Sequence, residues 1–393
     1  MSAENFFQQL GPLEALLEQP DIMEIMVNGY DQIFVERHGK IERVNDQFRD
    51  DDHLMQIIQL ILEPMGQHVS ESNPIVDVRL PDASRVHVVI PPIALTGPSL
   101  TIRKMIQRPV SMDDLLGWGS LSQEIATFLQ ACVAARLNMI ISGGTGSGKT
   151  TLMNVICQSI PNDERIIVLQ NDAELALKQE HVVVLETRPA NLEGRGEITM
   201  QQLVESAVKM RPDRLVVAEL RGPEVGDLIQ AFNNGYDGSL LSLHAISPVD
   251  ALTRLEIMAL EANPSLPLLS LRQLMASAFD VIVQIDRLHD GRRRAVRISE
   301  VAGLRGDLIV LNDLFEYVVT GQGEDGKLEG VFAPTGRVPI FMQQLDRADT
   351  HLPASMFTPT YDILRRVPPP PPPVPPIPPT PPTAPKPFRR SRL

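Results

Sequence analysis

"MIISGGTGSGKTTLMNV", residues 139–155, decides the fold of this 393-residue chain. An apolar run precedes a glycine-rich loop, and a helical pattern follows it. From Gly143 to Thr150 the loop fits G-x-x-x-x-G-K-[ST] without a mismatch. Because backbone N–H groups must approach phosphate oxygens closely and side chains would block them, such a loop predicts a nucleotide site. Lys149 is expected at the β- and γ-phosphates, and the Thr150 hydroxyl on Mg²⁺.

Outward from this loop, strand and helix patterns alternate. The apolar runs "NMIIS", "RIIVLQ", "RLVVAEL" and "GSLLSLHA" are separated by helical patterns. This alternation predicts an α/β fold with a mainly parallel sheet and helices on its faces. The first helix is expected to begin at a capping box from Ser120 to Gln123. Residues 248–320 predict two helices and an antiparallel end.

The chain divides into five segments. Residues 1–106 alternate helix and strand patterns and predict a compact α+β domain. Residues 107–119 form a linker, 120–320 the P-loop domain, and 321–366 an extension that the pattern leaves unassigned. Residues 367–393 are rich in proline and predict an extended, disordered tail. That tail is either inert or a tether that presents its basic end to an acidic partner or an anionic lipid surface.

Composition narrows the function classes. Hydrophobic residues make up 43% and charged residues 22%, as in a folded globular protein. The acidic start predicts no signal peptide, and no apolar run approaches a membrane span, so a cytoplasmic protein is expected. The net charge of the chain is −13, and residues 1–366 alone carry a net charge of −17. So acidic a segment argues against non-specific binding to nucleic acid.

The two cysteines carry little functional signal. Cys132 and Cys157 lie on helical apolar stripes, which predicts buried, structural thiols. Two cysteines also exclude a disulfide scaffold and a four-cysteine zinc site.

Two residues that follow apolar strands are candidates for catalysis. A P-loop enzyme needs an acid near Mg²⁺ and the attacking water, and Glu219 ends the run "RLVVAEL", with Arg221 two residues on. By itself, a glutamate there would more often be a solvated strand end. His244 ends "SLLSLHA", where ligands bind in parallel sheets, although a lone histidine there is more often structural.

A run of three arginines, Arg292 to Arg294, follows the turn "DG". The run is interpreted as the solvated tip of a hairpin. The remaining histidines show no metal-ligand spacing.

Seven segments resemble the CpaF/TadA-type ATPases of the type II/type IV secretion superfamily, which assemble Flp/Tad pili. They span roughly residues 10–317 and exclude the Pro-rich tail. They are "LGPLEALLEQPDIMEIMVNG", "DVRLPDASRVHVVIPP", "GPSLTIRK", "GGTGSGKTT", "MRPDRLVVAELRG", "GYDGSLLSLHAISPVDALTRLE" and "FDVIVQIDRLHDGRRR".

The resemblance implies a hexameric motor with a mobile N-terminal domain, a RecA-like motor domain and ATP with Mg²⁺ between them. Inner-membrane platform proteins and, indirectly, pilin would be its partners at the cytoplasmic face. Glu219 would be the Walker B acid, and His244 would belong to the histidine box. Arg85 and Arg103 would approach the nucleotide when the domains close. The nucleotide would contact Gly143, Gly144, Thr145, Gly146, Ser147, Gly148, Lys149, Thr150 and Thr151, with Thr150 and Glu219 at the metal.

Three departures from the family pattern make fast hydrolysis uncertain. The family's aspartate box begins Glu-Asp, whereas this chain has Gln170 and Asn171, followed by Asp172 and the expected Glu174. An amide cannot accept a proton in catalysis. The other two departures are Ala218 before Glu219 and Tyr236 at the first position of the histidine box.

Three functions therefore remain. The favoured one is an ATP-hydrolysing motor of pilin export or polymerisation. The second is a nucleotide-binding assembly subunit that hydrolyses little or no ATP. The third, a nucleic-acid translocase, is disfavoured by the acidic segment 1–366.

Overall fold

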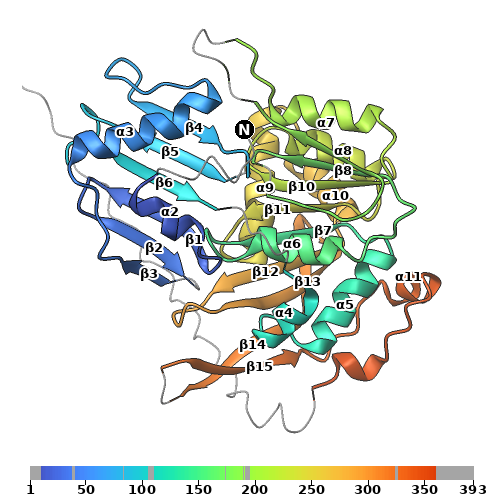
Figure 1. The fold of residues 1–393 in the computed structure, drawn as a ribbon. Coiled ribbons are helices and arrows are strands. Elements are labelled where there is room, and N and C mark those ends of the chain that lie inside the picture. The colour runs from blue at the N-terminus through green and yellow to red at the C-terminus, as the bar shows by residue number, and fades with distance from the viewer. Residues whose placement is uncertain are drawn as a thin grey trace, which may run out of the picture.

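The structure is a computed structural model that describes residues 10–37, 40–82, 84–104, 110–172, 174–188, 190, 195–323 and 326–359. The predicted tail at 367–393 lies outside these residues. Figure 1 shows two sheets, one in the N-terminal part of the chain and one around the P-loop. The predicted α/β architecture is confirmed.

The N-terminal domain is an antiparallel sheet with helices on one face. Its strands are β1 (Ile22–Asn28), β2 (Ile33–Arg37), β3 (Lys40–Arg43), β4 (Ile75–Arg79), β5 (Arg85–Val89) and β6 (Ser99–Arg103). Its helices are α2 (Pro12–Leu17), α3 (Asp51–Leu62) and the 3-10 turn η1 (Glu63–Met65). Within the described residues the strand order is β3-β2-β1-β6-β5-β4.

The helix α3 forms because its apolar side chains recur at helical spacing behind a capping residue. Asp50 accepts the His53 N–H at 2.7 Å. Leu54, Ile58 and Ile61 are fully buried against the sheet. Strands β4, β5 and β6 alternate buried and more exposed residues, so the second face of the sheet is left for polar side chains.

The second sheet contains the P-loop. Its strands are β7 (Met139–Gly143), β8 (Ile166–Gln170), β9 (Val182–Glu186), β10 (Arg214–Leu220), β11 (Leu240–His244), β12 (Val281–Arg287), β13 (Arg293–Arg305), β14 (Leu308–Gln322) and β15 (Leu328–Pro334). Its order among the described residues is β15-β14-β13-β12-β7-β11-β10-β8-β9. Strands β7 to β12 pair in parallel, whereas β13, β14 and β15 add antiparallel hairpins.

Helices cover both faces of this sheet. One core joins α4 (Met112–Gly117), α5 (Gln123–Ala134) and α6 (Lys149–Cys157) to the sheet. The other core joins α7 (Met200–Lys209), α8 (Val225–Asn233), α9 (Pro248–Ala262) and α10 (Leu268–Ala278). Successive residues of β7 alternate between the two cores, Ile140 on one side and Ile141 on the other. All residues of β7 are buried, as expected for a strand covered on both faces.

The segment that the sequence left unassigned completes the first core. Strand β15 extends the sheet, and α11 (Met342–Arg347) and η2 (Ala354–Phe357) follow it. Phe128 of α5 contacts Phe315, Phe341 and Phe357, with ring centroids 5.6–6.3 Å apart. Figure 1 shows this C-terminal part beside α4 and α5.

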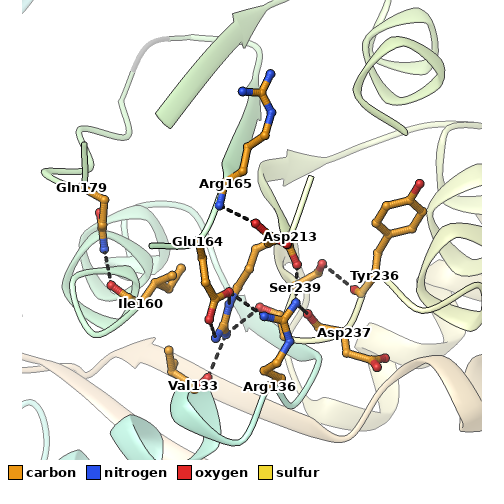
Figure 2. A network of polar contacts seen from close by, with 12 residues as sticks. Val133, Arg136, Ile160, Glu164, Arg165, Gln179, Asp213, Tyr236, Asp237 and Ser239 are labelled. Carbon is orange, nitrogen blue, oxygen red and sulfur yellow. Dashed lines mark hydrogen bonds and ion pairs between the residues drawn. The ribbon is translucent and has the colours of Figure 1, made fainter. Parts of the chain in front are cut away.

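A buried ion-pair network lies at the amino-terminal ends of the parallel strands. Arg214, the first residue of β10, is 0% exposed and holds Glu164 through Nε at 2.5 Å and Nη2 at 2.8 Å. Arg136 reaches the same carboxylate at 2.8 Å. Figure 2 shows Arg136 and Glu164 pointing toward each other near Val133. The Val133 carbonyl accepts from Arg214 Nη1 at 2.8 Å. We call Arg136, Glu164 and Arg214 the buried network.

The start of α5 differs from the prediction, whereas the two cysteines agree with it. The predicted capping box is wrong, because α5 begins after Ser122, whose hydroxyl accepts the Ile125 N–H at 3.3 Å. Cys132 and Cys157 are buried free thiols, as predicted. Among the described residues, no helix is both long and apolar enough to cross a membrane.

Candidate functional site

The P-loop leaves the carboxyl end of β7 between two neighbouring strands, β11 and β12. A Cβ added to Gly143 would lie 2.2 Å from the Ile285 carbonyl oxygen and 2.5 Å from Ser147 Oγ. Gly146 and Gly148 have φ values of 68° and 100°. Close packing at Gly143 and left-handed backbone at the other two positions explain why this loop is built from glycine.

The Lys149 ammonium lies inside this loop. Its Nζ donates to the carbonyls of Gly143 at 3.1 Å and Gly144 at 3.0 Å. Burial lowers the pKa of Lys149, and the nearby carboxylates of Glu219 and Glu174 partly offset that effect. A desolvated cation with weakly paired donors is suited to bind a phosphate oxygen.

Two acidic residues lie near the loop, Glu174 in the segment after β8 and Glu219 on β10. The Thr150 hydroxyl, at the start of α6, donates to Glu174 Oε2 at 3.0 Å. Glu219, near the end of β10, accepts from Arg221 Nη2 at 2.5 Å, and this hydrogen bond raises the pKa of Arg221. The structure therefore gathers Lys149, Thr150, Glu174 and Glu219, which the sequence assigned to one site.

His244 and Tyr236 are separated by the length of β11. His244 pairs with Gly143 in the parallel register, at the P-loop end of the sheet. Tyr236 precedes the strand, and its hydroxyl donates to the Val208 carbonyl at 3.1 Å. Figure 2 shows Tyr236 near Ser239, at the end that holds the buried network. The substitution at Tyr236 therefore lies away from the P-loop.

The two amides of the aspartate box make contacts within the fold. Gln170, the last residue of β8, is 0% exposed, and its Oε1 accepts the Leu175 N–H at 3.1 Å. Its Nε2 is buried without a hydrogen-bond partner among the described residues. Asn171 Oδ1 accepts from the Thr187 hydroxyl at 3.2 Å. Gln170 thus shapes the loop that carries Asp172 and Glu174.

Five charged residues of the N-terminal domain form one row across its open face. The strand registers place Glu24 opposite both Glu36 and Arg103, Arg103 opposite Arg85, and Arg85 opposite Arg79. We call this set the charged row. Burial raises the pKa of Glu24, an effect that Arg103 opposes.

The second domain offers opposite charges to this row. Two arginines of the row pair with acids in the loop after β8, and a third pairs with the last residue of β9. The glutamate at the end of the row faces an arginine of the second domain. The pairs are Arg79–Glu186 at 2.9 Å, Arg85–Asp172 at 2.7 Å, Arg103–Glu174 at 3.6 Å and Glu36–Arg293 at 3.9 Å. Arg85 also pairs with Asp77 at 2.7 Å, and this contact raises the pKa of Arg85. Arg85 and Arg103 therefore pair with acids close to the P-loop. Their approach to a nucleotide, which the resemblance implies, stays a prediction.

The arginine run is not a solvated tip, and that interpretation is wrong. Arg292 pairs with Asp290 at 2.6 Å, which holds the pKa of the Asp290 carboxyl down at about 2 against the effect of burial. Arg293 donates to the Gly146 carbonyl of the P-loop at 2.9 Å. Arg294 is 6% exposed and donates to the carbonyls of Trp118 and Gly119. The alternation of a strand, which sends Arg293 away from its two neighbours, was the signal that sequence reasoning missed.

The site fits the phosphates of a nucleotide with Mg²⁺. A glycine loop with no room for a Cβ at Gly143, a partly desolvated lysine and a buried Ser147 hydroxyl without a partner among the described residues all suit phosphate oxygens. Thr150 and Glu174 offer oxygen to a hard cation, which in such sites takes its remaining ligands from phosphate and water. Within the described ranges, no group of three or more His, Cys, Asp or Glu side chains is arranged to hold a metal ion by itself.

Comparison with known proteins agrees with this arrangement. Residues 7–302 match the family "Type II/IV secretion system protein". A protein of Mycobacterium tuberculosis named for conjugal transfer is 36% identical over 303 residues, covering 75% of this chain and 84% of its own. The type IV secretion system protein VirB11 of Brucella suis is 32% identical over 320 residues, covering 74% and 88%.

A solved structure supports the fold. The pilus retraction motor PilT, solved with bound ADP, has a TM-score of 0.53 at 18% identity and covers 74% of this chain and 82% of its own. The P-loop sheet, the flanking acids and these matches lead to one assignment: the chain belongs to the type II/IV secretion system protein family.

Proposed function

We propose that the chain is an ATP-hydrolysing motor of the CpaF/TadA type, which drives pilin export or polymerisation for a Flp/Tad pilus. It works as a homo-hexamer at the cytoplasmic face of the inner membrane, against membrane platform proteins. Family membership and the seven resembling segments support this proposal.

One observation carries the proposal. The acids beside the P-loop, Asp172 and Glu174, are paired with Arg85 and Arg103 of the other domain. A nucleotide bound at the P-loop would place phosphate charge among these same residues. Binding and release would therefore change the ion pairs between the domains, which is what a motor requires.

The residues of the site have distinct roles in the proposed reaction. Lys149 and the loop N–H groups hold the phosphates, and Thr150 and Glu219 hold Mg²⁺, with Glu174 beside them. Mg²⁺ would neutralise charge that develops on the phosphates. Glu219, which accepts a hydrogen bond from Arg221, would take a proton from the attacking water, and His244 lies at the same edge of the sheet. An arginine brought to the γ-phosphate raises rates roughly 10³–10⁵-fold in other P-loop enzymes, the role proposed for Arg85 and Arg103.

Turnover of ATP by the purified chain tests the proposal. The K149A variant should lose nucleotide binding and turnover together. The E219Q variant should bind ATP and lose turnover by roughly 10²–10⁴-fold, because an amide cannot act as the base. R297A, which alters a surface ion pair on β13, is the matched control. Turnover by E219Q at the wild-type rate would show that Glu219 is misassigned.

A second function is favoured by the aspartate box. Because Gln170 and Asn171 are amides, neither supplies a carboxylate to the metal or to water. Both are also engaged in contacts within the fold. The chain would then be a nucleotide-binding assembly subunit that hydrolyses ATP slowly or not at all. Tight nucleotide binding by a sized oligomer, with turnover no faster than in K149A, would support this second function and contradict the first.

A further inference from the structure

Arg293 joins three parts of the molecule. It begins β13, contacts the P-loop and faces β2 of the N-terminal domain. We propose that Arg293 is a positioning residue of the nucleotide site, which fixes the P-loop and makes its affinity for nucleotide depend on the N-terminal domain through Glu36. This inference deepens the proposed function and rests on it.

The contact with the P-loop is specific. Arg293 Nε donates to the Gly146 carbonyl at 2.9 Å. The Arg293 stem also lies over the loop, because a Cβ added to Gly148 would be 3.1 Å from Arg293 Cδ. The side chain therefore holds two glycines whose own backbones impose little restraint.

The chemistry of the peptide explains why this contact affects phosphate. The carbonyl of Gly146 and the N–H of Ser147 belong to one peptide unit. A cationic donor on the carbonyl polarises the unit and makes its N–H a stronger donor. In this structure the Ser147 N–H donates to the Gly144 carbonyl at 3.3 Å. Because P-loop N–H groups bind phosphate, Arg293 strengthens this donor for the phosphate that replaces the carbonyl.

The contact with the N-terminal domain is weaker and exchangeable. Arg293 Nη2 lies 3.9 Å from Glu36 Oε1, and the two side chains are 38% and 22% exposed. Glu36 is the end of the charged row, on the opposite side from Arg79. When the N-terminal domain moves, Glu36 moves with it, and the guanidinium that holds the P-loop loses or gains a counter-charge.

Binding of a fluorescent adenine nucleotide with Mg²⁺, together with the steady-state KM and kcat, tests this inference. R293A should weaken nucleotide binding and raise KM by roughly tenfold, the loss of one charge-assisted hydrogen bond, with little change in kcat. R293K keeps the stem and one donor and should recover part of the affinity. E36Q should weaken binding by about twofold at low salt, and the difference should vanish at high salt.

R297A on the same strand is the control and should match the wild type. Nucleotide binding by R293A within twofold of wild type would overturn the inference, as would a loss of kcat and melting temperature with KM unchanged. An E36Q variant identical to wild type at low salt would overturn the coupling. Failure of the wild type to bind any adenine nucleotide would overturn the proposed function as well, whereas equal binding by wild type and R293A would overturn only this inference.

Discussion

The buried network and the charged row use the same chemical groups at opposite ends of the parallel strands. In the buried network, Arg214 is fully buried and Glu164 is 14% exposed, and only Arg136 at its rim is 38% exposed. Glu164 holds the two arginines at 2.5–2.8 Å. In the charged row, the pairs that cross between domains are 2.7–3.9 Å apart, and their side chains are 22–64% exposed. A buried pair is costly to break, whereas an exposed pair contributes only about 0–1 kcal/mol.

This difference indicates which part of the molecule is rigid and which part can move. The buried network ties β10 to the end of α5 at Val133. It cannot exchange partners without leaving the buried Arg214 guanidinium without its counter-ion. The pairs of the charged row can be exchanged for phosphate or water at small cost. Guanidinium and carboxylate thus serve the fold at one end of the strands and domain motion at the other.

The largest expected effect is on the buried network. E164Q leaves Arg214 buried without its counter-ion and should lower the free energy of unfolding by about 3–5 kcal/mol, measured by denaturant unfolding. Burial tends to raise the pKa of Glu164, but the hydrogen bonds from Arg214 lower it overall. The stabilisation is therefore present above the unfolded pKa, near 4.5, and is lost as pH falls through the lower folded value. A cost below about 1 kcal/mol at pH 7 would remove the contrast with the charged row.

Gln170 provides the next test, because it belongs to the nucleotide end of the strands yet is fully buried. Although the family pattern has glutamate here, Q170E should lower the free energy of unfolding by about 1–3 kcal/mol, since the carboxylate would lose water and gain few partners. Its folded pKa should be raised, so the loss should grow as pH rises through that value. Unfolding at pH 5 and pH 8 measures the effect, with Q130E at an exposed position of α5 as control. Equal stability of Q170E and wild type at both pH values would contradict the assignment.

The smallest expected effect is at the outer end of the charged row. R79E should destabilise the chain by about 1 kcal/mol or less, and the exchange R79E/E186R should recover most of it. The coupling energy from the four unfolding curves should shrink in 1 M NaCl, because the pair is a third exposed. A coupling that is independent of salt would show that this pair behaves like the buried network.

The sequence predicted what is local and missed what depends on register. The P-loop and Glu219 are read from a strand, a turn and a helix that follow one another. The charged row could not be predicted from the sequence, because it exists only when five strands from separate parts of the chain pair in one register. The burial of Gln170 and the contact of Arg293 with Gly146 likewise depend on neighbours that are far apart in sequence.

The aromatic contacts of Phe128 set a lower limit on how far the chain can be shortened. The family match ends at residue 302, but Phe315, Phe341 and Phe357 complete the surroundings of Phe128. A fragment that ends with that match would expose an aromatic surface around Phe128 and would leave β13 without its partner strand β14. Such a fragment is expected to aggregate, and fragments meant for crystallisation or assay should extend to residue 359.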